Sequence, residues 1–390
     1  MEFLKINWYL KVIVIFSVVA LLAGGCTTDS NPVTTEDKNK VAGTWLWAFN
    51  DDDDEVLIYE AFSGVERASY SASSHMRMHA LAAGPSDAPT VWMASGTTAY
   101  AFTAGSADKI PKPYATLEVG ENPVHIGHTP DGMFVAFAND ISQTISVIDV
   151  DQKEVIQTVT HASGHSSALL TGEYVITTAA TGSGDTWAKI VKVENDSLVD
   201  SLTIGNGAHG DAYYAAIGRG FVACAGAIYA IDVAKREVVD SMPYTEEGRT
   251  SFMYYGHSSS VAVGLHNFED SDKLMLIDMA NNGLEYLTLQ GSVLPRNITA
   301  GQFALTGDGH RAVIADLAQP RIFVVSTETG SVITLDAPAE GAAVAVNADA
   351  STVWAKSGKT ISVIDVASNS VTHTFDIDEG TDWIYITSVN

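Results

Sequence analysis

The chain has 390 residues, of which 46% are hydrophobic and 17% are charged, so it can bury a large core and is not composed like a disordered protein. It carries 21 Lys and Arg residues against 47 Asp and Glu residues, a formal net charge of −26 at pH 7. Such a surface repels nucleic acid and anionic lipid headgroups and attracts cations, so we expect no nucleic-acid partner.

The N-terminus has the pattern of a bacterial lipoprotein signal peptide. Lys5 and Lys11 precede an apolar run at 12–25 that is short for a membrane span. Cys26 directly follows small residues, as the lipidated cysteine of a lipoprotein does, although Ala23 stands where the usual signal has Leu. We therefore predict a signal peptide at 1–25, lipidation of Cys26, and a polar, flexible linker over 26–43. The protein would then be anchored in the bacterial cell envelope and face the periplasm or the cell exterior; an ordinary cleaved signal is the alternative.

The rest of the chain repeats one supersecondary unit. The segment TISVIDVDQKEVIQTV at 144–159 recurs as TISVIDVASNSVTHTF at 360–375, and weaker copies lie between and before them. Each copy is an apolar β-branched run, a polar turn and a second run. Units of roughly 40 to 45 residues with four antiparallel strands are typical of β-propeller blades.

Taken in chain order, the units predict an all-β fold, a β-propeller of eight blades over residues 44–390. The first unit supplies only three strands, GTWLWAFN, EVLIYEA and ERASYSA. Complete units then begin at MRMHALAAG, VHIGH, HSSALL, AYYAAI, SFMYYG, GQFALT and AAVAVN. The last segment, DWIYITSVN, can join the first blade as its missing innermost strand, which closes the ring and removes an open sheet edge. Seven blades are the alternative, if the first or second unit lies outside the ring.

Histidines gather where the innermost strands of four adjacent blades are predicted to start. In a propeller these starts surround one mouth of the central channel, so residues about 40 apart in sequence meet there. Seven of the eleven histidines lie at such starts: His75, His79, His125, His128, His161, His165 and His209, with Asp211 close to the last.

Neutral imidazoles from different strands suit Zn²⁺, and sites without thiolates also admit Cu²⁺ or Ni²⁺. His125, His165 and His209 form the best cross-blade trio, and His79 or Asp211 could add a further ligand. His125 and His128 are three apart and point to opposite faces of a strand, so they cannot easily share one metal. Alternatively, all these histidines cap strand ends and bond to carbonyl groups in a polar channel mouth.

Four stretches, PVHIGH, SGHSSALL, AHGDA and FVACAG, resemble the corresponding stretches of AztD-type periplasmic zinc chaperones. Those are β-propeller proteins that hand zinc to the solute-binding protein of a zinc ABC importer. The resemblance implies zinc as the cargo, that solute-binding protein as a partner, and a metal site at His125, His165, His209 and Asp211. This sequence departs from the family's pattern of two cysteines. Cys224 matches the second cysteine of the pair, and the first is absent here. The family's disulfide is therefore absent, as is its His-rich N-terminal segment. The VIDV repeats also resemble YncE-like and lactonase-like propellers.

These observations favour a monomeric cell-envelope metallochaperone or store that binds zinc and is not an enzyme. One alternative is a lactonase-like hydrolase, in which a metal at the channel mouth polarises a carbonyl group and activates water. Another is a non-catalytic scaffold whose face binds protein or glycan.

Overall fold

A computed structural model of the chain describes residues 43–50, 53–71, 77–83, 89–106, 109–180, 182–245, 250–256, 259–266, 271–296 and 301–388. All of these lie in the unit Lys40–Asn390. The predicted signal peptide, Cys26 and nearly all of the linker lie outside the described residues. Within the described part of the chain, no helix is long and apolar enough to cross a membrane.

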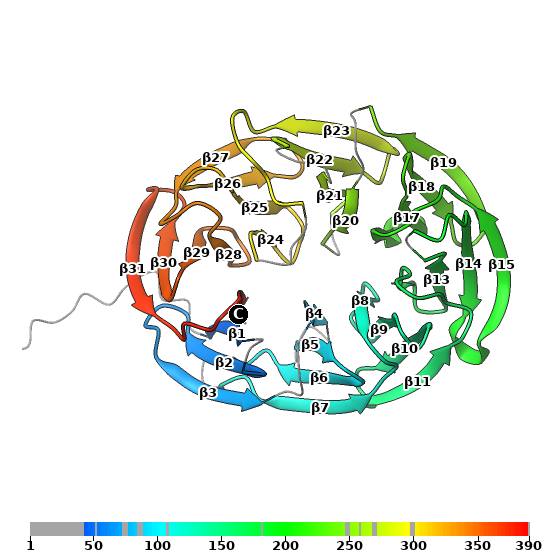
Figure 1. The fold of residues 1–390 in the computed structure, drawn as a ribbon, viewed down its shortest axis with the longest axis horizontal. Coiled ribbons are helices and arrows are strands. Elements are labelled where there is room, and N and C mark those ends of the chain that lie inside the picture. The colour runs from blue at the N-terminus through cyan, green and yellow to red at the C-terminus, as the bar shows by residue number, and fades with distance from the viewer. Residues whose placement is uncertain are drawn as a thin grey trace, which may run out of the picture. The chain divides into compact units, whose positions relative to one another are not determined.

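The described residues form eight four-stranded antiparallel sheets arranged in a ring, so the prediction of an eight-bladed β-propeller is confirmed (Figure 1). We number the blades from the N-terminus. The first four contain β1 (Thr44–Asn50), β2 (Glu55–Glu60), β3 (Glu66–Ser71) and β32 (Trp383–Ser388); β4 (Arg77–Ala83), β5 (Thr90–Ser95), β6 (Thr98–Thr103) and β7 (Pro113–Glu118); β8 (Pro123–His128), β9 (Phe134–Asn139), β10 (Thr144–Asp149) and β11 (Glu154–Val159); and β12 (Leu169–Leu170), β13 (Tyr174–Thr178), β14 (Trp187–Lys192) and β15 (Ser197–Thr203).

Blades 5 to 8 repeat this order along the chain. They contain β16 (Asp211–Tyr214), β17 (Arg219–Ala223), β18 (Ala227–Asp232) and β19 (Glu237–Pro243); β20 (Thr250–Tyr254), β21 (Val261–His266), β22 (Lys273–Asp278) and β23 (Gly283–Thr288); β24 (Phe303–Leu305), β25 (Arg311–Ala315), β26 (Arg321–Ser326) and β27 (Val332–Asp336); and β28 (Ala343–Val346), β29 (Thr352–Ser357), β30 (Thr360–Asp365) and β31 (Ser370–Asp376). Two short 3-10 helices, η1 (Val193–Asn195) and η2 (Ala215–Ile217), interrupt the strands.

The position of a strand within its blade explains its sequence pattern. The third strand of blade 3, β10, is buried along nearly its whole length, because neighbouring blades cover both of its faces. The outermost strand, β11, alternates between exposed and partly buried residues, because one of its faces meets water. This contrast is the physical basis of the repeated VIDV segments, which are apolar on both faces.

The hydrophobic core lies between the blades. Buried apolar side chains of the described residues form eight clusters, one at each junction between neighbouring blades. At the junction of blades 1 and 8, for example, Leu46 packs in the same cluster as Trp354. Each blade is therefore stabilised by stacking on its two neighbours, as expected of a repeat fold.

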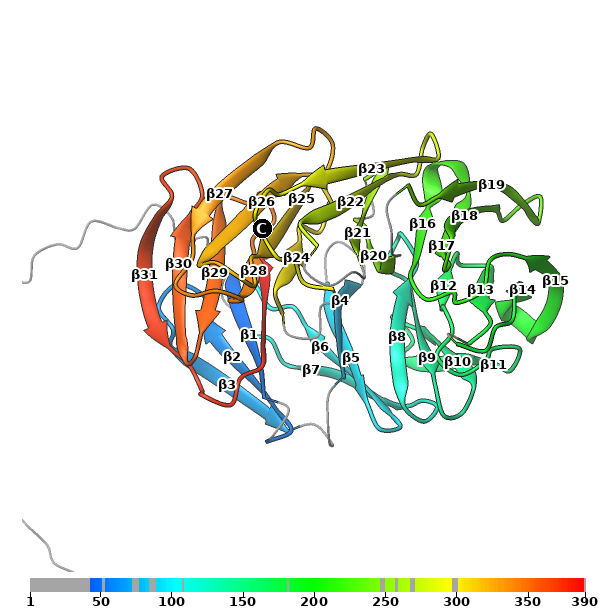
Figure 2. The ribbon, with the colours of Figure 1, turned by 45° about the horizontal axis from the view of Figure 1, so that its top comes forward.

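The last strand closes the ring. β32 pairs with β1 in antiparallel register, with Trp47 opposite Tyr385, and forms the innermost strand of blade 1 (Figures 1 and 2). The Trp47 indole N–H donates to the Thr387 hydroxyl at 2.9 Å, and that hydroxyl donates to the Ala104 carbonyl of blade 2 at 3.0 Å. The predicted closure by the C-terminal strand is thus confirmed.

Candidate metal centre

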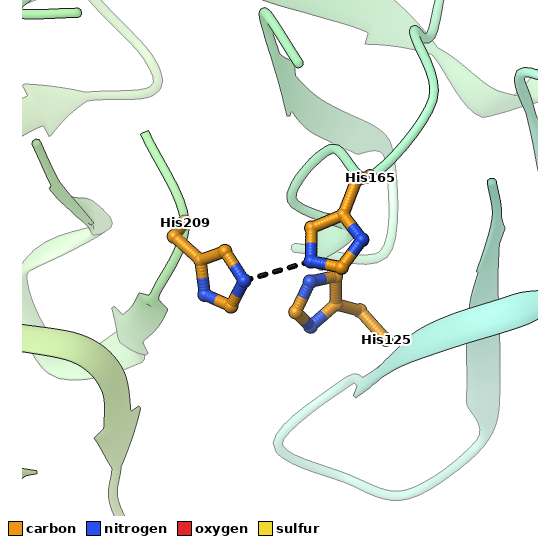
Figure 3. A group of neighbouring side chains, drawn as sticks. All are labelled: His125, His165 and His209. Atoms are coloured by element: carbon orange, nitrogen blue, oxygen red, sulfur yellow. Dashed lines mark hydrogen bonds between the residues drawn. The ribbon is translucent and has the colours of Figure 1, made fainter. Parts of the chain in front are cut away.

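Three imidazoles from three successive blades meet on one side of the channel (Figure 3). His125 lies on β8, and His165 and His209 lie in the segments that lead into β12 and β16. Each side chain offers a ring nitrogen, and the three nitrogens lie within 4.8 Å of one another. Because each residue is about one repeat unit from the next, the propeller geometry brings them to equivalent places in adjacent blades.

Glycines allow the innermost strands to approach closely here. A Cβ atom at Gly127 on β8 would lie 2.2 Å from the Ala168 carbonyl oxygen of blade 4, well inside contact distance. A Cβ atom at Gly210 would lie 3.0 Å from the Met253 backbone nitrogen of blade 6. Only a residue without a side chain lets these backbones approach so closely.

His165 has an unusual backbone conformation. Its φ is 52°, in the left-handed region that non-glycine residues adopt at a cost of about 1–3 kcal/mol. Histidine tolerates this region better than most residues do. In this conformation the His165 ring points at the His209 ring, and their Nε2 atoms lie 2.8 Å apart (Figure 3). One ring must donate a proton and the other accept it, so the two facing nitrogens cannot both be protonated.

The rings are arranged around a common point. His125 meets His165 and His209 edge to face, with ring centroids 5.1 and 4.9 Å apart and interplanar angles of 82° and 83°. The centroids of His165 and His209 are 4.8 Å apart. His209 is only 8% exposed, whereas His125 and His165 are partly exposed. The Nε2 atom of His125 is nevertheless buried, so all three imidazoles are largely enclosed and His209 is the least exposed among them.

The donor set and its geometry fit a zinc ion. With Zn–N bonds of about 2.0–2.1 Å, tetrahedral ligand nitrogens lie about 3.3 Å apart. The hydrogen-bonded pair, at 2.8 Å, would open by about 0.5 Å, and the widest pair, at most 4.8 Å, would close by about 1.5 Å. Side-chain rotations can supply both shifts. Three imidazoles leave one tetrahedral position for water or an exchanging ligand.

Asp211 lies beside the trio but is not part of it. Burial raises the pKa of Asp211 to about 6, although the neighbouring Ser167 side chain and Ala168 backbone oppose the rise. Asp211 on blade 5 thus lies beside the chain segment that follows His165.

The other predicted ligands lie elsewhere or outside the described residues. His128 is 6% exposed, and its Nδ1 lies 3.0 Å from the Thr129 carbonyl oxygen. The His161 carbonyl oxygen accepts a hydrogen bond from Lys189. Neither imidazole belongs to the group of three that the described residues form. For His79 the structure describes only the backbone, on β4, and His75 lies outside the described residues. The Cys224 side chain is fully buried.

A cavity of about 370 Å³ occupies the channel next to the trio. His125 and His209 form part of its wall, and aromatic side chains line other parts: Phe252, Tyr254, Phe303, Trp383 and Tyr385. These aromatic residues were not assigned to a site from the sequence. The signal was present, because several of them stand at or near the starts of innermost strands in blades without a histidine there.

Comparisons with known proteins support the fold. No family model matches the chain, and no curated protein matches it. Two structures of AztD from Citrobacter koseri are similar, both at 15% identity over 88% of this chain: apo AztD, with a TM-score of 0.69 over 98% of its length, and a second structure, with a TM-score of 0.70 over 97%. The dihydro-heme d1 dehydrogenase NirN in complex with DHE is similar with a TM-score of 0.63, at 11% identity over 90% of this chain and 76% of that one. The expected likeness to an AztD-type propeller is thus confirmed for the fold.

Proposed function

We propose that this protein is a zinc-binding protein of the bacterial cell envelope that stores zinc or delivers it to a partner. The observation that carries the proposal is the convergence of His125, His165 and His209, with ring nitrogens within 4.8 Å of one another. Imidazole nitrogens are ordinary zinc ligands, and three of them hold the ion while leaving a position open for exchange.

Two features of the site suit transfer rather than permanent retention. His165 is partly exposed, so an incoming ligand can replace it first and open the site. The net charge of −26 raises the concentration of cations near the surface and speeds their encounter with the site. A structural zinc site would instead be closed by four protein ligands.

The resemblance to zinc chaperones and the signal-like N-terminus supply the rest of the proposal. The protein would be lipidated at Cys26, tethered to the membrane by the segment 26–43, and act as a monomer. Its partner would be the solute-binding protein of a zinc ABC importer. Zinc is favoured by that resemblance, although imidazole sites of this kind generally bind Cu²⁺ more tightly.

The test is a competition titration of the purified full chain against a chromophoric zinc chelator, preceded by elemental analysis of the protein as isolated. We expect one tightly bound zinc ion in the wild type and its loss in the double variant His125→Ala with His209→Ala. His310→Ala is the matched control, because that imidazole pairs with Glu328 at 3.1 Å and is not in the trio. Unchanged stoichiometry and affinity in the double variant would refute the proposal. Turnover of lactones or esters that a chelator abolishes would favour the hydrolase instead.

A further inference from the structure

The cavity beside the three histidines has aromatic walls. Phe252 stacks nearly parallel to Tyr254, with ring centroids 6.2 Å apart and an interplanar angle of 11°. The Tyr254 ring lies 4.7 Å from that of Phe303, and Trp383 and Tyr385 line the same cavity. Aromatic residues of blades 1, 6 and 7 therefore border this space. The face of an aromatic ring carries partial negative charge and attracts cations.

A carboxyl group lies in the same wall. Asp211, at the start of β16, lines the cavity, and no Lys or Arg is among the described side chains that do so. Burial raises the pKa of Asp211 to about 6, and the two groups that oppose this rise, the Ser167 side chain and the Ala168 backbone, are uncharged. Buried charges in proteins are normally paired, because an isolated charge loses its hydration at a large cost. A cation in the cavity would pair with this carboxylate.

The charge of Asp211 is felt elsewhere in the cavity wall. Tyr255 also lines the cavity, and burial together with the neighbouring Asp211 carboxylate raises the pKa of its hydroxyl group. That hydroxyl group therefore stays protonated and neutral near pH 7. The described wall thus has one carboxylate and neutral phenols, and the whole protein carries a net charge of −26, so both favour a cationic ligand.

The size of the cavity suits a small organic cation. An apolar cavity of about 150 Å³ holds benzene, so a space of about 370 Å³ can hold one ring together with a bulky ammonium group. Apolar and aromatic walls with a few polar groups are the usual composition of a pocket for an organic ligand. A bare metal ion needs several ligand atoms close together, and among the described residues only the three histidines offer such a group.

We propose that the channel binds a small organic ammonium cation with an apolar body. The charged nitrogen lies near the Asp211 carboxylate, and the apolar body packs against the rings of Phe252, Tyr254 and Phe303. Aromatic side chains recognise quaternary ammonium groups in this way. The inference goes beyond the proposed function, because the carboxylate and the aromatic walls do not depend on a bound metal.

The ammonium cation and a metal ion at the trio would oppose each other. His125 and His209 also line the cavity, so a zinc ion on their ring nitrogens would place positive charge close to the ammonium group. Like charges repel more strongly in an enclosed site than in water. Each ligand should therefore weaken the binding of the other by the same factor, which for coupled sites is typically about 5- to 150-fold.

The experiment is calorimetric titration of the metal-free full chain at pH 8, where the Asp211 carboxyl group is ionised. Benzyltrimethylammonium is the probe, because it can neither coordinate a metal nor lose its charge. Dimethylbenzylcarbinol is the matched neutral compound, since it has nearly the same shape. We expect the cation to bind at least roughly tenfold more tightly than the alcohol, because only the cation is attracted by the ring faces and the carboxylate.

Variants then locate the cation. Asp211→Asn should weaken cation binding by roughly tenfold and leave alcohol binding unchanged, because only the cation interacts with the lost charge. Phe252→Leu keeps the apolar bulk and removes a ring, so it should weaken the cation at least roughly threefold more than the alcohol. Asp336→Asn is the matched control, because it removes the same charge from an exposed position on the outermost strand β27. It should bind the cation like the wild type.

The outcomes separate this inference from the proposed function. If the cation binds the wild type no more tightly than the alcohol, or binds Asp211→Asn like the wild type, the inference is wrong. The zinc-loaded protein should bind the cation at least about fivefold more weakly, and unchanged or tighter binding would show that the cation lies elsewhere. If the chain binds the cation as described and binds no zinc, the inference stands and the proposed function fails.

Discussion

Replacement of His165 provides the sharpest prediction, because the backbone and the side chain of this residue can be tested separately. His165→Asn removes the imidazole but keeps a residue that tolerates the left-handed φ of 52°. His165→Ala removes the imidazole and also places a Cβ-bearing residue with no such tolerance in that conformation. The two variants should therefore share a loss of metal binding and differ in stability, with Ala about 1 kcal/mol less stable.

The expected size of the metal effect follows from the ligand count. Loss of an outer-shell partner commonly weakens metal binding by about 10- to 100-fold, so loss of one of three direct ligands should weaken it by at least about 100-fold. Zinc at 100 times the wild-type dissociation constant stabilises the protein by about 2.7 kcal/mol. For a domain of about 350 residues, whose unfolding entropy is about 0.7 kcal/mol/K, that is a rise in Tm of about 4 °C. At the same zinc concentration, a 100-fold weaker site contributes about 0.4 kcal/mol, or about 0.6 °C.

The assay is thermal unfolding of both variants and the wild type, with zinc and with a chelator. His310→Asn is the control and should retain the full zinc-dependent rise, because His310 is paired with Glu328 instead. A zinc-dependent rise of about 4 °C in His165→Asn would contradict the assignment of His165 as a ligand. Equal stability of the Asn and Ala variants in chelator would contradict the strain argument.

Three further predictions concern the frame around the site. Gly127→Ala should lower the free energy of unfolding by about 1–3 kcal/mol, because its Cβ would lie 2.2 Å from a carbonyl oxygen, whereas Gly226→Ala, with no atom within 4 Å, should be neutral in urea unfolding. The carboxyl group of Asp211 has a pKa of about 6 in the folded protein against an ordinary value of 3.8, so it binds its proton more tightly when folded. Between about pH 4 and pH 6 the unfolded chain releases this proton first, and stability should fall with rising pH by up to about 3 kcal/mol. In Asp211→Asn, the urea midpoint of unfolding should change less with pH over this range than in the wild type. An unchanged dependence of the midpoint on pH would argue against burial of the carboxyl group. Thr387→Val should cost about 1–3 kcal/mol, because it leaves the buried Trp47 N–H without its acceptor, and Thr387→Ser should keep most of the stability; equal unfolding midpoints for the two variants would rule out that hydrogen bond as the cause.

Much of the architecture was accessible from the sequence, for a physical reason. A blade cannot bury its apolar faces alone, so each of the eight units had to carry the same pattern of apolar runs and turns. The copies at 144–159 and 360–375 record that constraint directly, and they allowed the blades to be counted. The unpaired segment after Asp382 also implied ring closure, because the first unit had three strands and an edge to fill. The repeat spacing even selected the trio His125, His165 and His209 as the best cross-blade group.

Tertiary structure alone decided which side chains share a point in space. His128 lies three residues along the strand from His125, and its ring bonds the neighbouring Thr129 carbonyl group. The spacing indicates that the two side chains point in different directions, but only the structure shows what each one contacts. Asp211 looked like a ligand from its place beside His209, yet the group of side chains close enough to share a metal contains only the three histidines. The aromatic wall of the cavity was hidden for the same reason: Phe252, Tyr254 and Phe303 come from two different blades, and apolar residues at strand starts look alike in sequence whether they face the core or the channel. Local patterns specify the strands, but only the packing of eight blades fixes which side chains face the channel and how far apart they lie.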